Sequence, residues 1–310
     1  MPSITLNNLS VGYLRGRRSP ISVLTHINAT LQSGRLTCLV GANGIGKSTL
    51  LRTLAAFQPP LAGQMFYHQD DNHAPTSLTS LSQTQLARVI SVVLTTKTSV
   101  ENLTVQQVVA LGRSPYTNIW GTLRADDHRK VQWAMHAVGI TALQNRMVQT
   151  LSDGERQKMM IAKALAQDTP VMLLDEPTAF LDYKSKVEMM TLLSALAHKT
   201  NKMVLLSTHD LEQAVHTADA LWVVTKSQTQ HAKPQDTTTN HTNLLAHLQV
   251  LEKRYLTNQL GQQHMAFCTE GQAESPEQAQ LTLASTTDYR QRTQALLQLL
   301  GEELAAVNDL

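Results

Sequence analysis

The segment Gly41-Ala42-Asn43-Gly44-Ile45-Gly46-Lys47-Ser48-Thr49 decides the fold of this 310-residue chain. An apolar run, Arg35 to Val40, precedes it and predicts a buried strand, and the apolar spacing after it predicts a helix from Lys47 to Phe57. The glycines let backbone N–H groups turn inward around phosphates, and the helix N-terminus adds a favourable dipole. Lys47 would reach the β- and γ-phosphates, and the Ser48 hydroxyl would bind Mg²⁺. The pattern GxxxxGK(S/T) between a strand and a helix therefore predicts a phosphate-binding loop.

Two acidic residues follow a second apolar run, Val171 to Leu174. A divalent cation between phosphate oxygens needs an oxygen ligand, and Asp175 could supply it directly or through water. Glu176 would orient and polarise the attacking water as a general base. Two acids at a strand end are more often simply solvated, but their pairing with a phosphate loop favours the catalytic interpretation.

Strands and helices alternate along most of the chain, which predicts a mostly parallel sheet with crossover helices. The hydrophobic periodicity places strands at 4–13, 21–31, 35–40, 89–94, 171–174, 203–207 and 221–225, and helices at 47–57, 105–111, 126–138, 155–166, 186–197 and 211–218.

Further motifs in the same order resemble those of ABC-type ATPases. Leu151-Ser152-Asp153-Gly154-Glu155 resembles the LSGGQ signature, and Ala179-Phe180-Leu181-Asp182 resembles the D-loop. His209 lies where that family has its switch histidine, and Tyr13 lies where an aromatic residue stacks on adenine. The resemblance covers residues 1 to about 226. It implies a P-loop NTPase of ABC type, with a RecA-like mostly parallel sheet core, an antiparallel β region and a helical signature subdomain at about 96–165.

The resemblance also implies a chemistry that one chain cannot complete. Two copies would form a head-to-tail dimer that holds ATP and Mg²⁺, with the phosphate loop of one copy facing the signature helix of the other. Ser152 and the Gly154 N–H would contact the partner's γ-phosphate from a helix N-terminus. ATP would close the dimer, and hydrolysis at Glu176, with help from His209, would reopen it.

Two positions depart from the family pattern. Leu86 to Leu94 matches the stretch before the coupling segment, but Thr95 follows where the family has Gln. The Thr side chain is shorter than Gln, so it could contact Mg²⁺ or the attacking water only through a second water. Gln83, Gln85 or a shifted register could substitute for the missing Gln side chain. Asp153 replaces a signature glycine, and its carboxylate would repel a partner phosphate unless it points away or caps the helix.

The arrangement of the motifs favours one branch of the family. About 110 residues separate Gly41 from Leu151, which leaves no room for the long coiled coil of repair ATPases, and the chain has one cassette where translation factors usually have two. No apolar run reaches the ~18–20 residues that span a bilayer. We therefore expect a peripheral subunit on the cytoplasmic face of the inner (plasma) membrane, attached to permease subunits and served indirectly by a substrate-binding protein, with no nucleic-acid partner.

The string at residues 111–116 indicates which class of substrate the transporter would carry. Leu111-Gly112-Arg113-Ser114-Pro115-Tyr116 resembles the stretch after the coupling loop in importers of iron-siderophores, haem and cobalamin. An ordinary amphipathic helix and loop is the alternative for this string. For the whole chain, Thr95 and Asp153 leave open a nucleotide-dependent regulatory or non-transport protein with weak hydrolysis.

The composition is uneven along the chain. The net charge of +2 divides into +6 for residues 1–226 and −4 for residues 227–310. We expect the last 84 residues to be a C-terminal extension, partly helical at Leu244 to Leu256 and Gln291 to Val307, whose role could be regulatory, dimerising or that of a poorly ordered tail. The N-terminus lacks the pattern of a signal peptide, and the two cysteines, Cys38 and Cys268, fit a reducing compartment.

Overall fold

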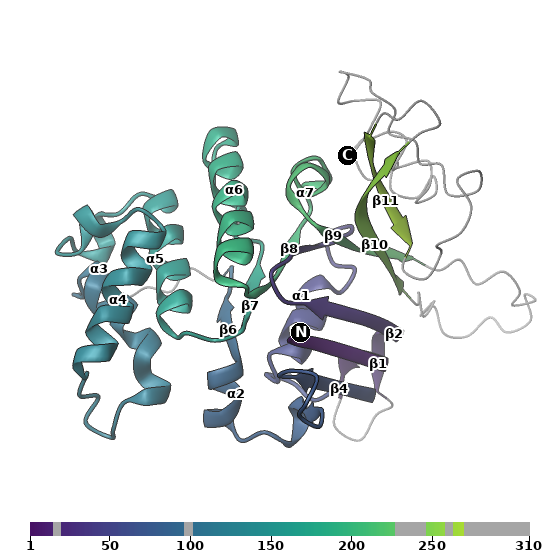
Figure 1. The fold of residues 1–310 in the computed structure, drawn as a ribbon, viewed down its shortest axis with the longest axis horizontal. Coiled ribbons are helices and arrows are strands. Elements are labelled where there is room, and N and C mark those ends of the chain that lie inside the picture. The colour runs from purple at the N-terminus through teal and green to yellow at the C-terminus, as the bar shows by residue number, and fades with distance from the viewer. Residues whose placement is uncertain (15–19, 96–101, 227–245, 258–262, 270–310) are drawn as a thin grey trace, which may run out of the picture. The chain divides into compact units, whose positions relative to one another are not determined.

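The computed structural model describes residues 1–14, 20–95, 102–226, 246–257 and 263–269 (Figure 1). Two compact units make up the chain. The phosphate-loop unit comprises Ile4–Thr30, Thr37–Phe66 and His209–Leu310, and the acidic-pair unit comprises Met1–Ser3, Leu31–Leu36 and Tyr67–Thr208. Each unit is built around its own run of strands.

In its described residues, the phosphate-loop unit is a strand-rich layer with two short helices. Its strand order is β4-β1-β2-β10-β9-β3, and β11 pairs with β10. Every residue of β3 is buried, and β3 runs parallel to β9 from Thr37 opposite Ala220 to Val40 opposite Val223. The elements are β1 (Ser3–Tyr13), β2 (Ile21–Gln32), β3 (Leu36–Val40), α1 (Lys47–Leu54), β4 (Ala62–His68), α7 (Leu211–Thr217), β9 (Ala220–Lys226), β10 (Ala246–Thr257) and β11 (Gln263–Thr269).

The acidic-pair unit contains a parallel three-stranded core in the order β8-β7-β6. Continuous apolar runs form these strands and are buried along nearly their whole length, as parallel strands covered on both faces require. The elements with this core are β5 (Thr76–Ser77), η1 (Leu78–Ser80), α2 (Gln83–Val89), β6 (Ile90–Val93), β7 (Val171–Asp175), α6 (Tyr183–Thr200) and β8 (Met203–Thr208).

A helical cluster completes the acidic-pair unit. The helices α3, α4 and α5 pack on one another in every pairing (Figure 1). Capping boxes begin α3 and α5, since Thr104 and Ser152 each accept a hydrogen bond from a backbone N–H three residues on. The elements are α3 (Val105–Ala110), η2 (Leu111–Tyr116), α4 (Ala125–Ala137), η3 (Thr141–Leu143), η4 (Val148–Thr150) and α5 (Asp153–Ala166). The predicted helical subdomain is therefore present.

The helix predicted at Leu244 to Leu256 is wrong. Residues Ala246–Thr257 form β10, which pairs antiparallel with β9 from Ala246 opposite Lys226 to Glu252 opposite Ala220. From Leu251 to Thr257, β10 also pairs antiparallel with β11. A free edge of β9 offers unpaired N–H and C=O groups, and pairing with it outweighs the helical spacing of a short apolar run. The predicted helix Gln291 to Val307 lies outside the described residues, and the division of the chain at residue 226 stays a prediction.

Among the described residues, no helix is long and apolar enough to cross a bilayer.

Candidate active site

The phosphate loop takes the conformation that its glycines predict. Gly41, Gly44 and Gly46 have φ values of 156°, 75° and 119°, which side chains with a Cβ rarely adopt. At Gly41 a Cβ would lie 2.8 Å from the backbone oxygen of Val224 on β9. The loop is therefore pressed against the end of the neighbouring strand, and glycine satisfies both the backbone conformation and the close approach.

Lys47 lies at the start of α1, and its side chain folds back over the loop. Its Nζ donates to the carbonyl oxygens of Gly41 at 2.7 Å and Ala42 at 3.1 Å, and the side chain is buried. Burial of an ammonium is costly unless its protons are bonded, and these carbonyls supply partners. The positive charge is thus held over the phosphate-binding loop rather than extended into water, and its contact with the β- and γ-phosphates stays a prediction.

Tyr13 ends β1 beside the helix that follows the loop. Its hydroxyl is 2.8 Å from Oγ1 of Thr49 in the first turn of α1, and about half of the side chain stays exposed. The hydrogen bond fixes the phenol end and leaves ring surface accessible for stacking. Its role toward adenine, like those of Asn43, Ile45 and Ser48 toward phosphate and metal, stays a prediction.

Substitution of Gly46 tests how closely the phosphate loop packs against β2. A Cβ there would lie 2.5 Å from Cγ1 of Val23 on β2, whereas a Cβ at Gly44 meets nothing within 4 Å. We expect Gly46→Ala to lower the free energy of unfolding by about 2–4 kcal/mol, through backbone strain plus overpacking. Gly44→Ala carries strain alone, about 1 kcal/mol. Urea unfolding and ATP binding of both variants test this, and equal losses would contradict the close approach to β2.

Asp175 and Glu176 form a corner at the end of β7. Asp175 is buried, and its Oδ1 accepts a 2.7 Å hydrogen bond from the Ser207 hydroxyl on β8. Glu176 has a φ of 45°, in the left-handed region, and its N–H donates to the same hydroxyl oxygen at 2.9 Å. Both carboxylates are predicted from the sequence, whereas Ser207 is not. Its only signal was a polar residue at the end of an apolar strand.

The predicted switch residue follows β8 directly. His209 is exposed, and the next residue, Asp210, begins α7 by accepting a hydrogen bond from the N–H of Gln213 at 3.2 Å. A capped helix start holds the backbone on the C-terminal side of His209 in a defined position. The catalytic role of His209 remains a prediction.

The signature residues are all at the N-terminus of α5. Ser152 accepts from the N–H of Glu155 at 3.3 Å and donates to its Oε2 at 3.0 Å. The N–H of Ser152 also donates to this carboxylate, and chiefly for that reason the pKa of Glu155 lies below its ordinary value. The hydroxyl proton of Ser152 is therefore committed within the helix cap and would have to turn away to meet a partner's phosphate.

Asp153, the residue that departs from the signature pattern, occupies the first turn of α5 and is exposed. An acidic residue there stabilises the helix dipole, which offers a local reason for its presence. The neighbouring Gly154 lies beside the D-loop, because a Cβ at this position would be 3.8 Å from Cδ2 of Leu181. Asp182 caps α6 by accepting from the N–H of Ser185 at 2.7 Å, and this bond lowers the pKa of Asp182.

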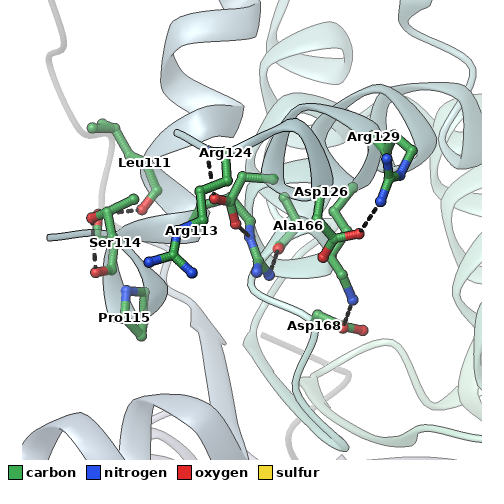
Figure 2. Close-up of polar contacts among 12 residues, drawn as sticks. Leu111, Arg113, Ser114, Pro115, Arg124, Asp126, Arg129, Ala166 and Asp168 are labelled. Carbon is green, nitrogen blue, oxygen red and sulfur yellow. Dashed lines mark hydrogen bonds and ion pairs between the residues drawn. The ribbon is translucent and has the colours of Figure 1, made fainter. Parts of the chain in front are cut away.

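The LGRSPY string lies at the junction of the three helices (Figure 2). Arg113 is buried, and its guanidinium donates to Oδ1 of Asp127 on α4 and to the backbone oxygen of Ala166 at the end of α5, both at 2.8 Å. It also lies 4.0 Å from the ring centre of Tyr116. A Cβ on Gly112 would be 2.2 Å from the backbone oxygen of Lys163. The string therefore locks η2 against α5 and α4.

The donor chemistry of this chain fits a magnesium ion. Asp175 offers a carboxylate and Ser48 a hydroxyl, both hard oxygen ligands. In the described part of the chain no group of three or more His, Cys, Asp or Glu side chains could hold a metal by itself. Mg²⁺ is suited to this situation, because it keeps several waters and completes its shell with nucleotide phosphates.

The glycine loop between β3 and α1, together with an acidic pair at the end of a parallel strand, defines a P-loop nucleotide hydrolase. Residues 24–179 match the ABC transporter family. Over 217 residues the chain is 39% identical to an uncharacterized ABC transporter ATP-binding protein of Methanocaldococcus jannaschii, covering 70% of this chain and 71% of the relative. It is 36% identical to the ferric enterobactin transport ATP-binding protein of Escherichia coli, covering 68% and 78%.

A solved structure extends the comparison to the fold. The dimeric structure of a bacterial ABC transporter cassette matches 71% of this chain and 93% of its own, with a TM-score of 0.59 and 25% identity. This chain belongs to the ABC transporter ATP-binding family and is an ABC-type ATPase. The fold class predicted from the sequence is confirmed.

Proposed function

We propose that this chain is the ATP-hydrolysing subunit of a membrane importer for an iron-siderophore, haem or cobalamin type substrate. The observation that carries the proposal is the presence in one chain of a phosphate loop covered by Lys47 and of the Asp175–Glu176 corner fixed by Ser207. Membership of the ABC family supports hydrolysis. The relative named for ferric enterobactin transport and the LGRSPY string support the substrate class.

The phosphate loop would bind the nucleotide. Its inward N–H groups and the ammonium of Lys47 would hold the β- and γ-phosphates, while the exposed ring of Tyr13 would stack on adenine. Ser48 and Asp175 would hold Mg²⁺, which offsets phosphate charge when bound.

Glu176 would act as the general base. Its carboxylate would accept a proton from water as the water oxygen bonds to the γ-phosphorus, while the bond from that phosphorus to the bridging oxygen of ADP breaks. Because the left-handed backbone at Glu176 is hydrogen-bonded to Ser207, the carboxylate starts from a defined position. His209 would help to orient the water or the γ-phosphate.

A second copy of the chain would complete each site. Ser152 and the N–H of Gly154 would contact the partner's γ-phosphate, at the cost of redirecting the Ser152 hydroxyl from Glu155. Asp182 would lie in the D-loop between the copies. Permease subunits would hold this dimer at the cytoplasmic face of the inner membrane, and a substrate-binding protein would supply the permease.

Uptake by cells tests the transport proposal. We expect deletion of the gene in the source organism to abolish uptake of ⁵⁵Fe-loaded siderophore, haem or labelled cyanocobalamin, assayed in parallel. Wild-type chain should restore that uptake and Lys47→Ala should not, because the ammonium over the loop is lost. Lys184→Ala, on the exposed start of α6, is the matched control and should restore uptake. Unchanged uptake of all three substrates after deletion would overturn the substrate class.

A further inference from the structure

The end of β7 is held from both sides by hydroxyl groups. From the β6 side, Oγ1 of Thr95 donates to the backbone oxygen of Asp175 at 2.7 Å. From β8, Oγ of Ser207 donates to Oδ1 of Asp175 at 2.7 Å and accepts from the N–H of Glu176 at 2.9 Å. Three hydrogen bonds thus converge on two consecutive residues, the proposed metal ligand and the proposed base.

Ser207 is placed for this contact by strand register. It lies opposite Asp175 in the parallel pairing of β7 with β8, and it is completely buried. A serine hydroxyl has one proton, which goes to the Asp175 carboxylate, so its oxygen is free to accept from Glu176. The same atom therefore fixes the side chain of one acid and the backbone of the next.

The backbone of Glu176 needs such support. A φ of 45° is uncommon for a residue with a Cβ, and strain of this kind persists only where the surroundings hold it. The Ser207 bond to the Glu176 N–H holds the peptide at the turn after β7. Loss of that acceptor would free the turn to relax and would move the carboxylate of Glu176.

Thr95 occupies the position at which the family pattern has Gln, but its contact is different from the metal contact expected there. Its proton is committed to a backbone carbonyl at the end of β7. That bond ties the segment after β6 to Asp175 itself. A change in the position of Thr95 would therefore be transmitted to the acidic corner through one short hydrogen bond.

We propose that Thr95 and Ser207 form a hydroxyl clamp, in which both act as positioning residues for the Asp175–Glu176 corner. Thr95 does not extend toward the nucleotide as the family Gln would. Together with Ser207, it instead fixes the positions of the two acids. This inference rests on the roles proposed above for Asp175 and Glu176.

Four variants and one control test the clamp by steady-state kinetics. Thr95→Val keeps the shape without the hydroxyl, and we expect kcat to fall about tenfold. Ser207→Ala also orphans the Glu176 N–H and should lower kcat about 10- to 100-fold. Thr95→Ser keeps the hydroxyl and should retain at least half of the wild-type kcat. Thr191→Val removes a similar bond, 2.9 Å to the backbone oxygen of Val187 on the exposed face of α6, and its kcat should be unchanged.

The fourth variant, Thr95→Gln, restores the family residue. The amide N–H₂ of Gln lies two bonds further from Cβ than the Thr hydroxyl and would extend past the Asp175 carbonyl, so we expect Thr95→Gln to be no faster than Thr95→Val. A kcat above that of the wild type would show that Thr95 is only a weakened Gln, and would overturn the clamp.

Nucleotide affinity and melting temperature distinguish a positioning role in catalysis from a general loss of structure. For the Thr95 variants we expect the affinity for ATP in EDTA and the melting temperature of the nucleotide-free protein to stay within the range of Thr191→Val. Ser207→Ala leaves buried polar groups without their partner and should also lower the melting temperature. Loss of ATP affinity or melting temperature without loss of kcat would contradict the clamp, as would wild-type kcat in Thr95→Val. A wild-type protein that releases no phosphate under any condition would contradict the proposed function instead.

Discussion

Glu176→Gln should stop ATP hydrolysis while leaving ATP binding intact. General base catalysis contributes roughly 10²–10⁴-fold, so we expect kcat for Mg²⁺-dependent phosphate release to fall by about that factor. The amide is nearly isosteric, and the N–H that Ser207 binds belongs to the backbone, so the corner should keep its shape. Phosphate release and ATP affinity of the purified protein are the measurements. Glu188→Gln, at an exposed position on α6, is the matched control and should hydrolyse ATP normally.

The same variant distinguishes a hydrolysing subunit from a regulatory switch. If hydrolysis reopens a dimer that ATP closes, Glu176→Gln should accumulate the dimer in ATP, and size-exclusion chromatography with light scattering will detect it. A protein that only senses nucleotide would show the same slow phosphate release and the same mass with either residue. That outcome would favour the alternative to which Thr95 and Asp153 first pointed.

Local chemistry explains why the phosphate loop could be predicted from the sequence. The left-handed glycines and the helix start at Lys47 are specified within nine residues, and the structure shows both. The caps are equally local, since Ser152 with Glu155 and Asp182 with Ser185 are pairs three residues apart, although the cap at Asp182 was not predicted from the sequence. Such features depend on neighbours along the chain rather than on the tertiary fold.

Features that depend on strand register could not be predicted in this way. Ser207 contacts Asp175 only because β7 and β8 pair with these residues opposite each other, 32 residues apart in sequence. Likewise, β10 forms because β9 offers an edge on which it can pair, although its apolar spacing also suits a helix. Residues 244–256 contain no local signal that decides between the two outcomes.

The LGRSPY string shows that a resemblance in sequence does not by itself identify a contact with substrate. Its resemblance to importers led to a substrate class, yet the contacts described for these residues all lie within the acidic-pair unit, with α4, α5 and α2. Gly112 permits close approach to α5, the Arg113 guanidinium contacts Asp127, Ala166 and the Tyr116 ring, and the Pro115 carbonyl accepts from Arg88 at 3.0 Å. The string therefore joins the helical cluster to α2 within one unit, and any link to substrate is indirect.

Arg113 offers the test of that structural role, because a second Arg–Asp pair lies nearby on α4 (Figure 2). The Arg113–Asp127 pair is about 95% buried on both sides, whereas Arg129 and Asp126 are 73% and 57% exposed. Arg113→Met would leave Asp127 buried and uncompensated, so we expect a loss of about 3–5 kcal/mol in the free energy of unfolding. Arg129→Met should cost less than about 1 kcal/mol. Urea unfolding followed by the fluorescence of Trp133 on α4 measures both.

The pH dependence of this loss identifies its cause. Burial alone would raise the pKa of Asp127, but the N–H of Arg124 and the Arg113 guanidinium hold it below its ordinary value. A lowered folded-state pKa gives stability that is present above the unfolded pKa, about 3.9, and lost as the pH falls through the folded value. The deficit of Arg113→Met should therefore be largest near pH 7 and shrink in acid, where Asp127 takes up a proton. Arg113→Met/Asp127→Asn should recover part of the loss at pH 7, since no buried charge remains. If Arg113→Met costs no more than Arg129→Met, the ion pair does not hold the three helices together.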